Sequence, residues 1–515
     1  DAAVGEPGVA RVTRGDPYSA SRIAHGVVYL IGGKAITSIA GIGTFLLLVR
    51  VLPVEQFAAY SILFALVELV DAITGVGLGQ VLSRYVPELY VGHRDYALRR
   101  LVAVTMALRL GVLGVFVALV YLLAPAVSPL IGLADWEWAV KGYLAVVLVR
   151  VVSTSLFGVL ESMLHQAIGQ IGFGLVTVLR FALLAGAASQ GVLDLEAVIL
   201  IEFVTDLIGC GIMSIGLLRA MPRDLASEAG GDAGWARANL RRMSEFGIKG
   251  YLQHMLILPY GTSTNRLLVG GALASSDVAL FGFAQSVAEL MERYLPVKLL
   301  AGVIRPVLTA RYVRDGRFAD LELAANLIFK INAFVICLSA VVIFAGGTDL
   351  IGLVSGGKYT VGSVPLLLLM CALVLMYSMR HMLDQVSHAV ERNGPLIWSN
   401  AIITSSVLPG IVLLPHFGVY AMPTSNLVGL AAGCLILIWR LRAEGFAYHQ
   451  DLAGLARMLA ATGVAVGAAE LVRRSGVGWA VALVASVAVF AGAIAALRPV
   501  NAAEGRLLVS LIKRR

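Results

Sequence analysis

Four basic side chains lie in long apolar stretches of the sequence with no acidic residue one helical turn away: Lys34, Arg150, Arg180 and Arg266. A charged side chain in a lipid-facing helix costs roughly 3 kcal/mol or more, so such groups usually face a protein interior or water. Arginine suits a pyrophosphate because its planar guanidinium donates paired hydrogen bonds to phosphate oxygens and stays charged when desolvated. We therefore predict that these side chains bind an anion.

Carboxylates interrupt another apolar stretch, VELVDAITGVGLGQVLSRY, where Glu68 and Asp71 precede Gly75, Gly77 and Gly79. Gly75 and Gly79 are typical of a small-residue face that allows close helix approach. The three glycines together predict a bend, because glycine adopts backbone conformations that other residues avoid.

Acidic and basic residues stand four positions apart at two further places, Glu289 with Arg293 and Arg380 with Asp384. Residues at this spacing share one helix face, so each pair predicts either a self-neutralising ion pair or part of a functional site. Arg293 and Arg380 therefore join the candidate anion-binding residues. The acidic candidates are expected to balance charge or to bind a coupling proton or sodium ion: Glu68, Asp71, Glu289, Glu292 and Asp384.

The composition places these groups in a membrane protein. Of 515 residues, 59% are apolar and 14% are charged, and the mean hydropathy is +0.86. This exceeds what a soluble core buries. Apolar runs of about 20 residues, the length of a membrane-crossing helix, occur about fourteen times, and one of them holds Glu202 and Asp206. We therefore predict an all-α integral membrane protein with about fourteen transmembrane helices.

Basic residues mark one side of the membrane. Alternate loops are rich in arginine, and because basic loops stay in the cytoplasm, both termini are predicted to face the cytoplasm. The formal net charge of +8 then reflects topology and anionic lipid headgroups, so no nucleic-acid partner is expected. The basic loops contain Arg94, Arg99, Arg100, Arg223, Arg237, Arg241, Arg242, Arg311, Arg314, Arg317, Arg440 and Arg442. The opposite loops contain Asp135, Glu137, Asp194, Glu196, Asp277 and Asp349, with Lys358, Arg473 and Arg474 as exceptions.

The two halves of the chain repeat each other. EQFAAYSILFALVEL, which starts at Glu55, aligns with SDVALFGFAQSVAEL, which starts at Ser276, so that Glu68 is equivalent to Glu289. An even number of spans separates the copies, which makes them parallel repeats; chance likeness between apolar helices is the alternative. We predict two parallel-related six-helix lobes around a central cavity, followed by two C-terminal helices. The predicted parts are a cytoplasmic tail at 1–22, an N-lobe at 23–220, a cytoplasmic linker at 221–243, a C-lobe at 244–442, two helices at 452–497 and a basic cytoplasmic tail at 498–515.

The sequence gives little indication of a disulfide framework, a metal site or a nucleotide-binding loop. The four cysteines lie singly in apolar spans, which indicates neither a disulfide framework nor a metal site. The segment GLVSGGKYT matches a phosphate-binding loop as far as Lys358, but Tyr359 stands where such a loop needs serine or threonine. No cofactor, metal or catalytic residue is expected.

Longer segments resemble a known family. RVLPVEQFAAY (Arg50–Tyr60) and GVGLGQVLSRYVPEL (Gly75–Leu89) are similar to the first hairpin of the polysaccharide transporters, the Wzx-type flippases of the multidrug, oligosaccharidyl-lipid and polysaccharide exporter superfamily. SGGKYTVGSVPLLLLM resembles their external segment before the tenth helix, and ERNGPLIWSNAI and PHFGVYAMPTSNLVG resemble the eleventh and twelfth helices. Ala58, and Met422 with Pro423, depart from the smaller residues of the family pattern.

The resemblance implies an inner-membrane flippase. Such a protein carries polyprenyl-pyrophosphate-linked oligosaccharide repeat units from the cytoplasmic to the periplasmic leaflet by alternating access, for O-antigen, exopolysaccharide or capsule synthesis. The lipid bilayer is an implied partner, and the pathway suggests a polysaccharide polymerase and a chain-length regulator. A lipid II flippase and a cation-coupled multidrug exporter of the same superfamily remain alternatives. A membrane polysaccharide polymerase or ligase is a further alternative, which the short external loops disfavour.

Overall fold

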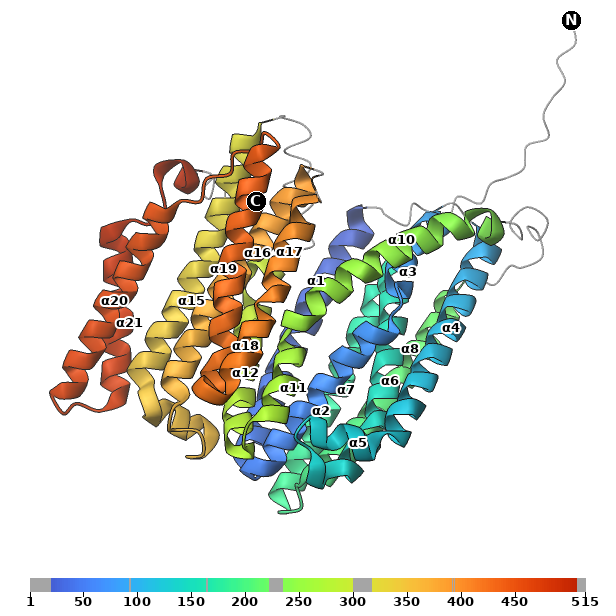
Figure 1. Ribbon diagram of the computed structural model, residues 1–515, viewed down its shortest axis with the longest axis horizontal. Coiled ribbons are helices and arrows are strands. Elements are labelled where there is room, and N and C mark those ends of the chain that lie inside the picture. Colours follow the sequence, from blue (N-terminus) through green and yellow to red (C-terminus); the bar gives the residue numbers. More distant parts are fainter. Residues whose placement is uncertain are drawn as a thin grey trace, which may run out of the picture.

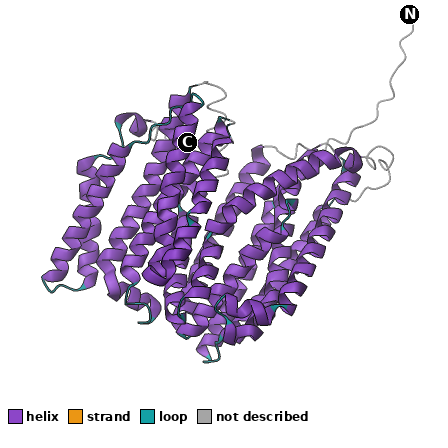
Figure 2. Ribbon diagram, in the orientation of Figure 1, coloured by secondary structure: helices purple, strands orange, loops and turns teal. Residues whose placement is uncertain are grey.

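The computed structural model describes residues 20–91, 94–163, 165–221, 235–299, 317–390, 392 and 394–506. Every regular element in these ranges is a helix, and most of the helices run side by side (Figures 1 and 2). Ten helical segments there are long and apolar enough to cross a membrane. The prediction of an all-α, multi-pass membrane protein is confirmed.

The N-terminal lobe contains eight α-helices whose outer surface is largely apolar. Two pairs of them each make one interrupted span, α2 with α3 and α4 with α5. The helices are α1 (Ala20–Val51), α2 (Val54–Thr74), α3 (Leu78–Val91), α4 (Asp95–Leu122), α5 (Ala124–Leu130), α6 (Glu137–Ser162), α7 (Gln166–Ser189) and α8 (Leu195–Ala220), with a short 3-10 helix, η1, at Ala134–Trp136.

The C-terminal lobe follows, and its first helix begins at Trp235, within the stretch assigned to a linker from the sequence. A pair of apolar helices, α20 and α21, packs outside this lobe against α15 (Figure 1). The helices are α10 (Trp235–Ile257), α11 (Thr262–Ala272), α12 (Ser275–Tyr294), α13 (Pro296–Leu299), α15 (Phe318–Ser355), α16 (Ser363–Ala389), α17 (Gly394–Ser405), α18 (Val407–Phe417), α19 (Ala421–Ala443), α20 (Leu452–Arg474) and α21 (Trp479–Leu497), with 3-10 helices η2 (Leu258–Tyr260) and η3 (Gly418–Tyr420).

The predicted bend in the second span is present, between α2 and α3. Val76 and Gly77 have positive φ angles of 43° and 74° there, which stops the α-helix. The close approach occurs at Gly77, where an added Cβ would overlap the backbone of Gly247 in α10. The expectation that Gly79 makes a close contact is wrong, because nothing lies within 4 Å of an added Cβ there.

The lobes meet where the two sequence repeats cross. α2 and α12 pack together, and a Cβ added at Gly282 of α12 would overlap the side chain of Ser61 in α2. Ser61 and Gly282 are equivalent positions in the predicted repeat. In a twofold arrangement, residues on the axis contact their own equivalents. This contact therefore supports a parallel pair of lobes related by an axis between α2 and α12.

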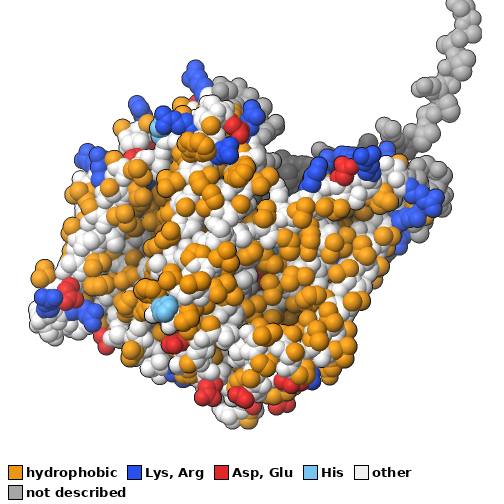
Figure 3. All heavy atoms as spheres, viewed as in Figure 1, with side chains coloured by type: hydrophobic (Ala, Val, Ile, Leu, Met, Phe, Trp, Pro, Cys, Tyr) orange, Lys and Arg blue, Asp and Glu red, His pale blue; other side chains and the backbone are white. Residues whose placement is uncertain are grey.

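Charged residues gather at opposite ends of the helices (Figure 3). We call the end that carries the starts of α4 and α10 and the C-terminus of α19 the basic end, and the end that carries the starts of α6, α8 and α12 the acidic end. In Figure 3 most blue atoms lie above the apolar belt and most red atoms below it. This separation matches the alternating loops seen in the sequence.

Aromatic and basic side chains join the lobes at the acidic end. The Phe283 ring stacks on Phe45, with centroids 6.1 Å apart, and on Tyr359, with centroids 5.2 Å apart. Lys358 Nζ donates hydrogen bonds to the carbonyl oxygens of Arg50 at 2.7 Å and Leu52 at 2.6 Å. Lys358 follows α15, so a C-lobe residue caps the C-terminus of α1.

A buried ion cluster anchors the C-terminal helices to α15. Lys330 Nζ lies 2.5 Å from Asp451 Oδ2 and 2.7 Å from Glu504 Oε2, and Lys330 and Glu504 are almost fully buried. Asp451 also accepts a hydrogen bond from the backbone amide of Gly454 and so caps α20. Burial by itself raises the pKa of Asp451, but the hydrogen bonds from Lys330 and Gly454 outweigh it and lower that pKa overall.

Candidate functional site

A polar cluster inside the N-lobe contains two of the predicted anion-binding arginines. Arg150 Nη2 of α6 lies 2.9 Å from Glu202 Oε2 and 2.7 Å from Asp206 Oδ2, both in α8. Arg180 of α7 forms an ion pair with Asp206 and a 3.2 Å hydrogen bond to Thr205. Two guanidiniums thus face two carboxylates, and the cluster carries no net charge.

Tyrosine hydroxyls complete this cluster. Tyr60 of α2 and Tyr143 of α6 each donate a 2.9 Å hydrogen bond to the Glu202 carboxylate. Glu202 therefore has an arginine and two hydroxyl partners while only 1% of its surface is exposed. Such a saturated carboxylate is stable in an apolar surrounding, because each charged oxygen has a donor.

A second cluster lies where α2, α11 and α12 meet. Arg266 Nη2 of α11 lies 2.9 Å from Glu289 Oε2 and donates a 3.0 Å hydrogen bond to Ser286, both in α12. Ser263, one turn earlier in α11, donates a hydrogen bond to Glu68 of α2. Glu68 and Glu289, which are equivalent in the repeat, are thus both bound by α11.

Phe64 of α2 brings the two clusters together. The guanidinium carbon of Arg150 lies 5.9 Å from the centre of the Phe64 ring, and that of Arg266 lies 5.8 Å from it. Arg150 belongs to the N-lobe and Arg266 to the C-lobe, whereas the ring is 38% exposed. An accessible aromatic side chain thus has one arginine from each lobe within cation–π distance. We call Arg150, Phe64 and Arg266 the interlobe site.

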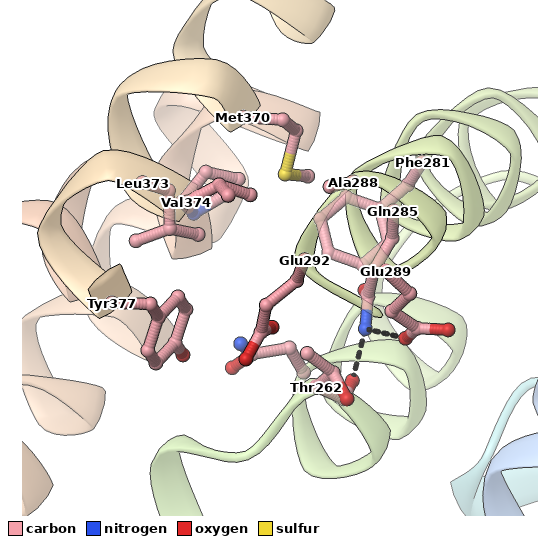
Figure 4. Close-up of a pocket in the computed structure, with 12 residues that line it drawn as sticks. Thr262, Phe281, Gln285, Ala288, Glu289, Glu292, Met370, Leu373, Val374 and Tyr377 are labelled. Atoms are coloured by element: carbon pink, nitrogen blue, oxygen red, sulfur yellow. Dashed lines mark hydrogen bonds between the residues drawn. The ribbon is translucent and has the colours of Figure 1, made fainter. Parts of the chain in front are cut away.

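A small cavity beside Glu289 has a polar wall and an apolar wall (Figure 4). The apolar wall includes Met370 and Val374 of α16. On the polar wall, the Gln285 side chain donates hydrogen bonds to the Thr262 carbonyl at 2.6 Å and to Glu289 Oε1 at 3.2 Å. The amide oxygens of Gln285 and Asn265 are buried without a hydrogen-bond partner among the described residues. The cavity therefore offers carbonyl oxygens next to a carboxylate.

The other predicted residues lie outside the two polar clusters, although Glu292 also lines the cavity beside Glu289 (Figure 4). Asp71 pairs with Arg109 of α4, and Glu292 lies 3.1 Å from Lys298 and 3.7 Å from the His381 ring. Arg380 pairs with Asp384 at 2.9 Å, as its spacing predicted, and donates a 2.7 Å hydrogen bond to Asn400. Arg293 is exposed at the end of α12. The side chain of Lys34 lies outside the described part of the structure.

The structure shows how these charges are paired. Of the two alternatives left open for Glu289 and Arg293, the ion pair does not form, because Glu289 pairs with Arg266 of the preceding helix. Arg150, Arg180 and Arg266, which have no acidic residue one turn away on their own helices, each have a carboxylate partner on another helix. Sequence spacing reveals partners within one helix, whereas these pairs join helices that only the folded structure brings together.

Several residues of these networks were not among the sequence-based candidates. Glu202 and Asp206 were noted in an apolar run but not selected, and Arg109, Phe64 and Tyr143 were not selected either. Arg109 meets the same criterion as Arg150, a basic residue in an apolar run with no acidic residue one turn away, and could have been selected. Phe64 and Tyr143 are aromatic residues in apolar helices, and nothing in the sequence separates them from core residues. Only their contacts in the folded structure, with Arg150 and Arg266 for Phe64 and with Glu202 for Tyr143, place them in these networks.

The chain is similar to membrane transport proteins and to one protein family. Residues 23–310 match the profile of a family described as polysaccharide biosynthesis protein. No curated protein sequence matches the chain. A structure titled lipid II flippase MurJ, inward closed conformation, has a TM-score of 0.68 at 11% identity, covering 91% of this chain and 98% of that one. A multidrug resistance MATE family transporter of the MOP superfamily, in an inward-facing conformation, has a TM-score of 0.63 at 13% identity, covering 82% and 98%. At these identities the likeness establishes the two-lobe transporter fold.

Proposed function

Because the chain belongs to the polysaccharide biosynthesis protein family, we propose that it is a flippase for polyprenyl-pyrophosphate-linked oligosaccharide repeat units. It carries them from the cytoplasmic to the periplasmic leaflet for O-antigen, exopolysaccharide or capsule synthesis, and it catalyses no covalent step. The two-lobe transporter fold supports this proposal, since the similar solved structures are a lipid II flippase and multidrug transporters. The observation that carries it is the interlobe site, where both lobes supply an arginine beside one exposed ring.

The arginines of this site hold the pyrophosphate by exchanging partners. Arg266 is paired with Glu289, and Arg150 is paired with Glu202 and Asp206, so both guanidiniums of the interlobe site have a carboxylate partner. A pyrophosphate group competes with the carboxylate for the same guanidinium donors, because both present a pair of charged acceptor oxygens. Exchange avoids the cost of a buried unpaired charge before the cargo arrives. Lys34, Arg180, Arg293 and Arg380 supply further positive charge along the route.

The carboxylates reset the site after transport. When the cargo leaves, Glu289 pairs with Arg266 again, and protonation or cation binding at the carboxylates controls that step. Glu68 has a serine rather than a basic partner, and the cavity beside Glu289 has two unpartnered amide oxygens, which suits a small cation or a proton. Asp71, Glu292 and Asp384 balance the charges of their own basic partners.

The proposed function also implies a membrane location and protein partners. The protein lies in the bacterial inner membrane with its basic end and both termini in the cytoplasm, as the arginine-rich loops indicate. The cargo is then passed to a polysaccharide polymerase and a chain-length regulator at the periplasmic surface.

The first test is a depletion experiment. In host cells depleted of the protein, leaflet-selective labelling and mass spectrometry would measure the polyprenyl-pyrophosphate glycans on each leaflet. We expect one completed repeat unit to accumulate on the cytoplasmic leaflet. Accumulation of lipid II there would instead assign the protein to peptidoglycan precursor transport. Accumulation on the periplasmic leaflet would indicate a polymerase or ligase, and unchanged lipid-linked glycans would indicate a drug exporter.

Variants separate the interlobe site from general loss of protein. Arg266→Ala should fail to restore transport in depleted cells at normal expression. The matched control is Arg474→Ala, which removes an exposed arginine at the acidic end that pairs with Glu470 four residues away on the same helix. Full transport by Arg266→Ala would remove this residue from the mechanism.

A further inference from the structure

An open groove of about 560 Å³ lies between α3 and α10 at the basic end. Its walls carry four basic side chains, Arg84 of α3 and Arg241, Arg242 and Lys249 of α10. The volume lies within the range of about 300–1,000 Å³ that small-molecule sites occupy. The groove therefore has room for a headgroup-sized ligand.

An aromatic floor fixes two of these arginines. Arg84 and Arg242, from different helices, both lie over the Tyr85 ring, with their guanidinium carbons 5.7 Å and 5.3 Å from its centre. Tyr85 is buried and meets Phe246 edge to face. A guanidinium held against a ring keeps its plane fixed while its N–H groups stay free to donate at the edge. Two such groups side by side form a preorganised set of hydrogen-bond donors for phosphate oxygens.

The groove differs from the polar cluster inside the N-lobe in its balance of positive and negative charges. In the N-lobe cluster, Arg150 and Arg180 face two carboxylates. In the groove, four basic side chains face only Glu245, on its wall, and Glu88, which lies 3.1 Å from Arg84 and 3.5 Å from Arg242. Two positive charges are left over among the described residues of the groove. An anion is needed to balance them.

The groove lies where the apolar surface of the protein ends. Basic side chains gather above the apolar belt at this end of the molecule (Figure 3). α10 starts there and descends alongside the lobes (Figure 1). Along α10, Phe246 lines the groove, and Ile248 and Leu252 expose apolar surface further along the helix. A ligand in the groove can thus place a charged group among the arginines and a hydrocarbon chain along the same helix.

We propose that this groove binds the headgroup of an anionic membrane phospholipid. Its phosphodiester accepts hydrogen bonds from Arg84 and Arg242, and its acyl chains follow the apolar face of α10. Because α3 belongs to the N-lobe and α10 leads into the C-lobe, the bound lipid stabilises the contact between them. The site is independent of the proposed cargo.

The test uses the full-length protein in nanodiscs of phosphatidylcholine with increasing phosphatidylglycerol, with bound lipid counted by native mass spectrometry. The Arg84→Ala/Arg242→Ala variant should bind phosphatidylglycerol at least about 100-fold more weakly, since each arginine loses a charge-assisted hydrogen bond to the phosphodiester that contributes roughly tenfold or more. The control Arg99→Ala/Arg100→Ala removes two positive charges from the start of α4, at the same end of the molecule, and should leave binding unchanged. Both arginines of the first pair are about half exposed, and thermal unfolding in pure phosphatidylcholine checks that the variant folds.

Three results would overturn the proposal. Equal weakening in both variants would mean that general surface charge attracts the lipid. Displacement of phosphatidylglycerol by millimolar inorganic phosphate would mean that the groove takes a free anion. Preferential retention of polyprenyl diphosphate over phosphatidylglycerol, lost in Arg84→Ala/Arg242→Ala, would mean that the groove receives the cargo instead.

Discussion

Each arginine of the interlobe site forms an ion pair with a carboxylate, and in the proposed mechanism the cargo replaces that carboxylate. Burying a lone guanidinium is costly, whereas a paired one is tolerated in an apolar surrounding. In the proposed mechanism the pairs at Arg150 and Arg266 stabilise the protein without cargo, and the cargo displaces them. In that mechanism the released carboxylate becomes a site for a proton or cation, which links cargo binding and coupling at one side chain.

Glu289→Gln is expected to tighten cargo binding. The amide competes less well than the carboxylate for Arg266, so the guanidinium is freed for the pyrophosphate. One charge-assisted hydrogen bond contributes about 1.5–3 kcal/mol, which corresponds to an affinity increase of roughly tenfold or more. Binding of polyprenyl diphosphate to the purified variant, followed by tryptophan fluorescence or native mass spectrometry, measures this.

Arg266→Gln/Glu289→Gln is the matched control for this prediction, because it removes both charges and should bind more weakly than wild type. Tighter binding by this double variant as well would contradict partner exchange at Arg266. Tighter binding by Glu289→Gln alone supports it.

At the residue scale the sequence identified the basic residues inside apolar helices but not the residues that they contact. Arg150, Arg180 and Arg266 were selectable because a charge in an apolar run is conspicuous. Their partners were not, since Glu202 follows Arg150 by 52 residues and Glu289 follows Arg266 by 23. Among the candidate residues, the one described ion pair within a single helix turn, Arg380 with Asp384, was predictable from spacing.

At the scale of elements, the polar groups that anchor helices are placed at helix ends. Asp451 caps α20 and also holds Lys330 of α15, so one carboxylate fixes both the start of a helix and its neighbour. Glu504, which follows α21 in the sequence, completes the cluster, so residues before α20 and after α21 meet at the same lysine. The broken span at α2 and α3 was predictable because glycines favour a break, but the partner of Gly77 was not.

Lys330→Met is expected to release α20 and α21 from the C-lobe. The substitution leaves the nearly inaccessible Glu504 and its neighbour Asp451 without a cation, and breaking a buried ion pair costs about 3–5 kcal/mol. Proteolysis in the connection at 444–451 and thermal unfolding in detergent measure this release. Lys330→Met/Asp451→Asn/Glu504→Gln, which removes all three charges, should recover most of the loss. A single variant as resistant as wild type would show that apolar packing alone holds the pair.

Acid should weaken the same anchor. The pKa of Asp451 is lower in the folded protein than in the unfolded chain, so its contribution to stability is complete above the unfolded value of about 3.9. That contribution is lost as the pH falls through the lowered folded pKa. Unfolding of the detergent-solubilised protein between about pH 5 and pH 2 should therefore show a steeper acid loss than Asp451→Asn. Identical profiles would contradict a charged role for Asp451.

At the scale of the whole molecule, the lobes are joined at the acidic end by contacts that the proposed alternating access would have to break. Ser61 meets Gly282, the aromatic rings of Phe45, Phe283 and Tyr359 stack, and Lys358 caps α1. The parallel lobes were predictable from the repeat, because equivalent sequences fold alike. The sequence did not predict that the lobes are joined at the acidic end rather than at the basic end, since both ends of each helix carry comparable apolar residues.

Lys358→Met should make the acidic end open more often. The ammonium caps carbonyls that otherwise lack partners, and losing one such charged hydrogen bond raises the open population roughly tenfold. Labelling of Ser61→Cys by a membrane-impermeant maleimide reports this opening. Lys358→Arg keeps a donor at the cap and should label at nearly the wild-type rate; equally fast labelling of both variants would contradict a capping role.

A cross-link at the seam tests whether opening there is part of transport. Ser61 and Gly282 approach closely enough for the Ser61→Cys/Gly282→Cys variant to form a disulfide after a small backbone shift. We expect this bond to hold the acidic end closed and to abolish transport, with a reductant restoring it. Ser61→Cys alone controls for the four native cysteines, all of which are free thiols in the structure. If the oxidised double variant transports at the wild-type rate, the lobes do not separate along α2 and α12, and the cargo leaves by another route.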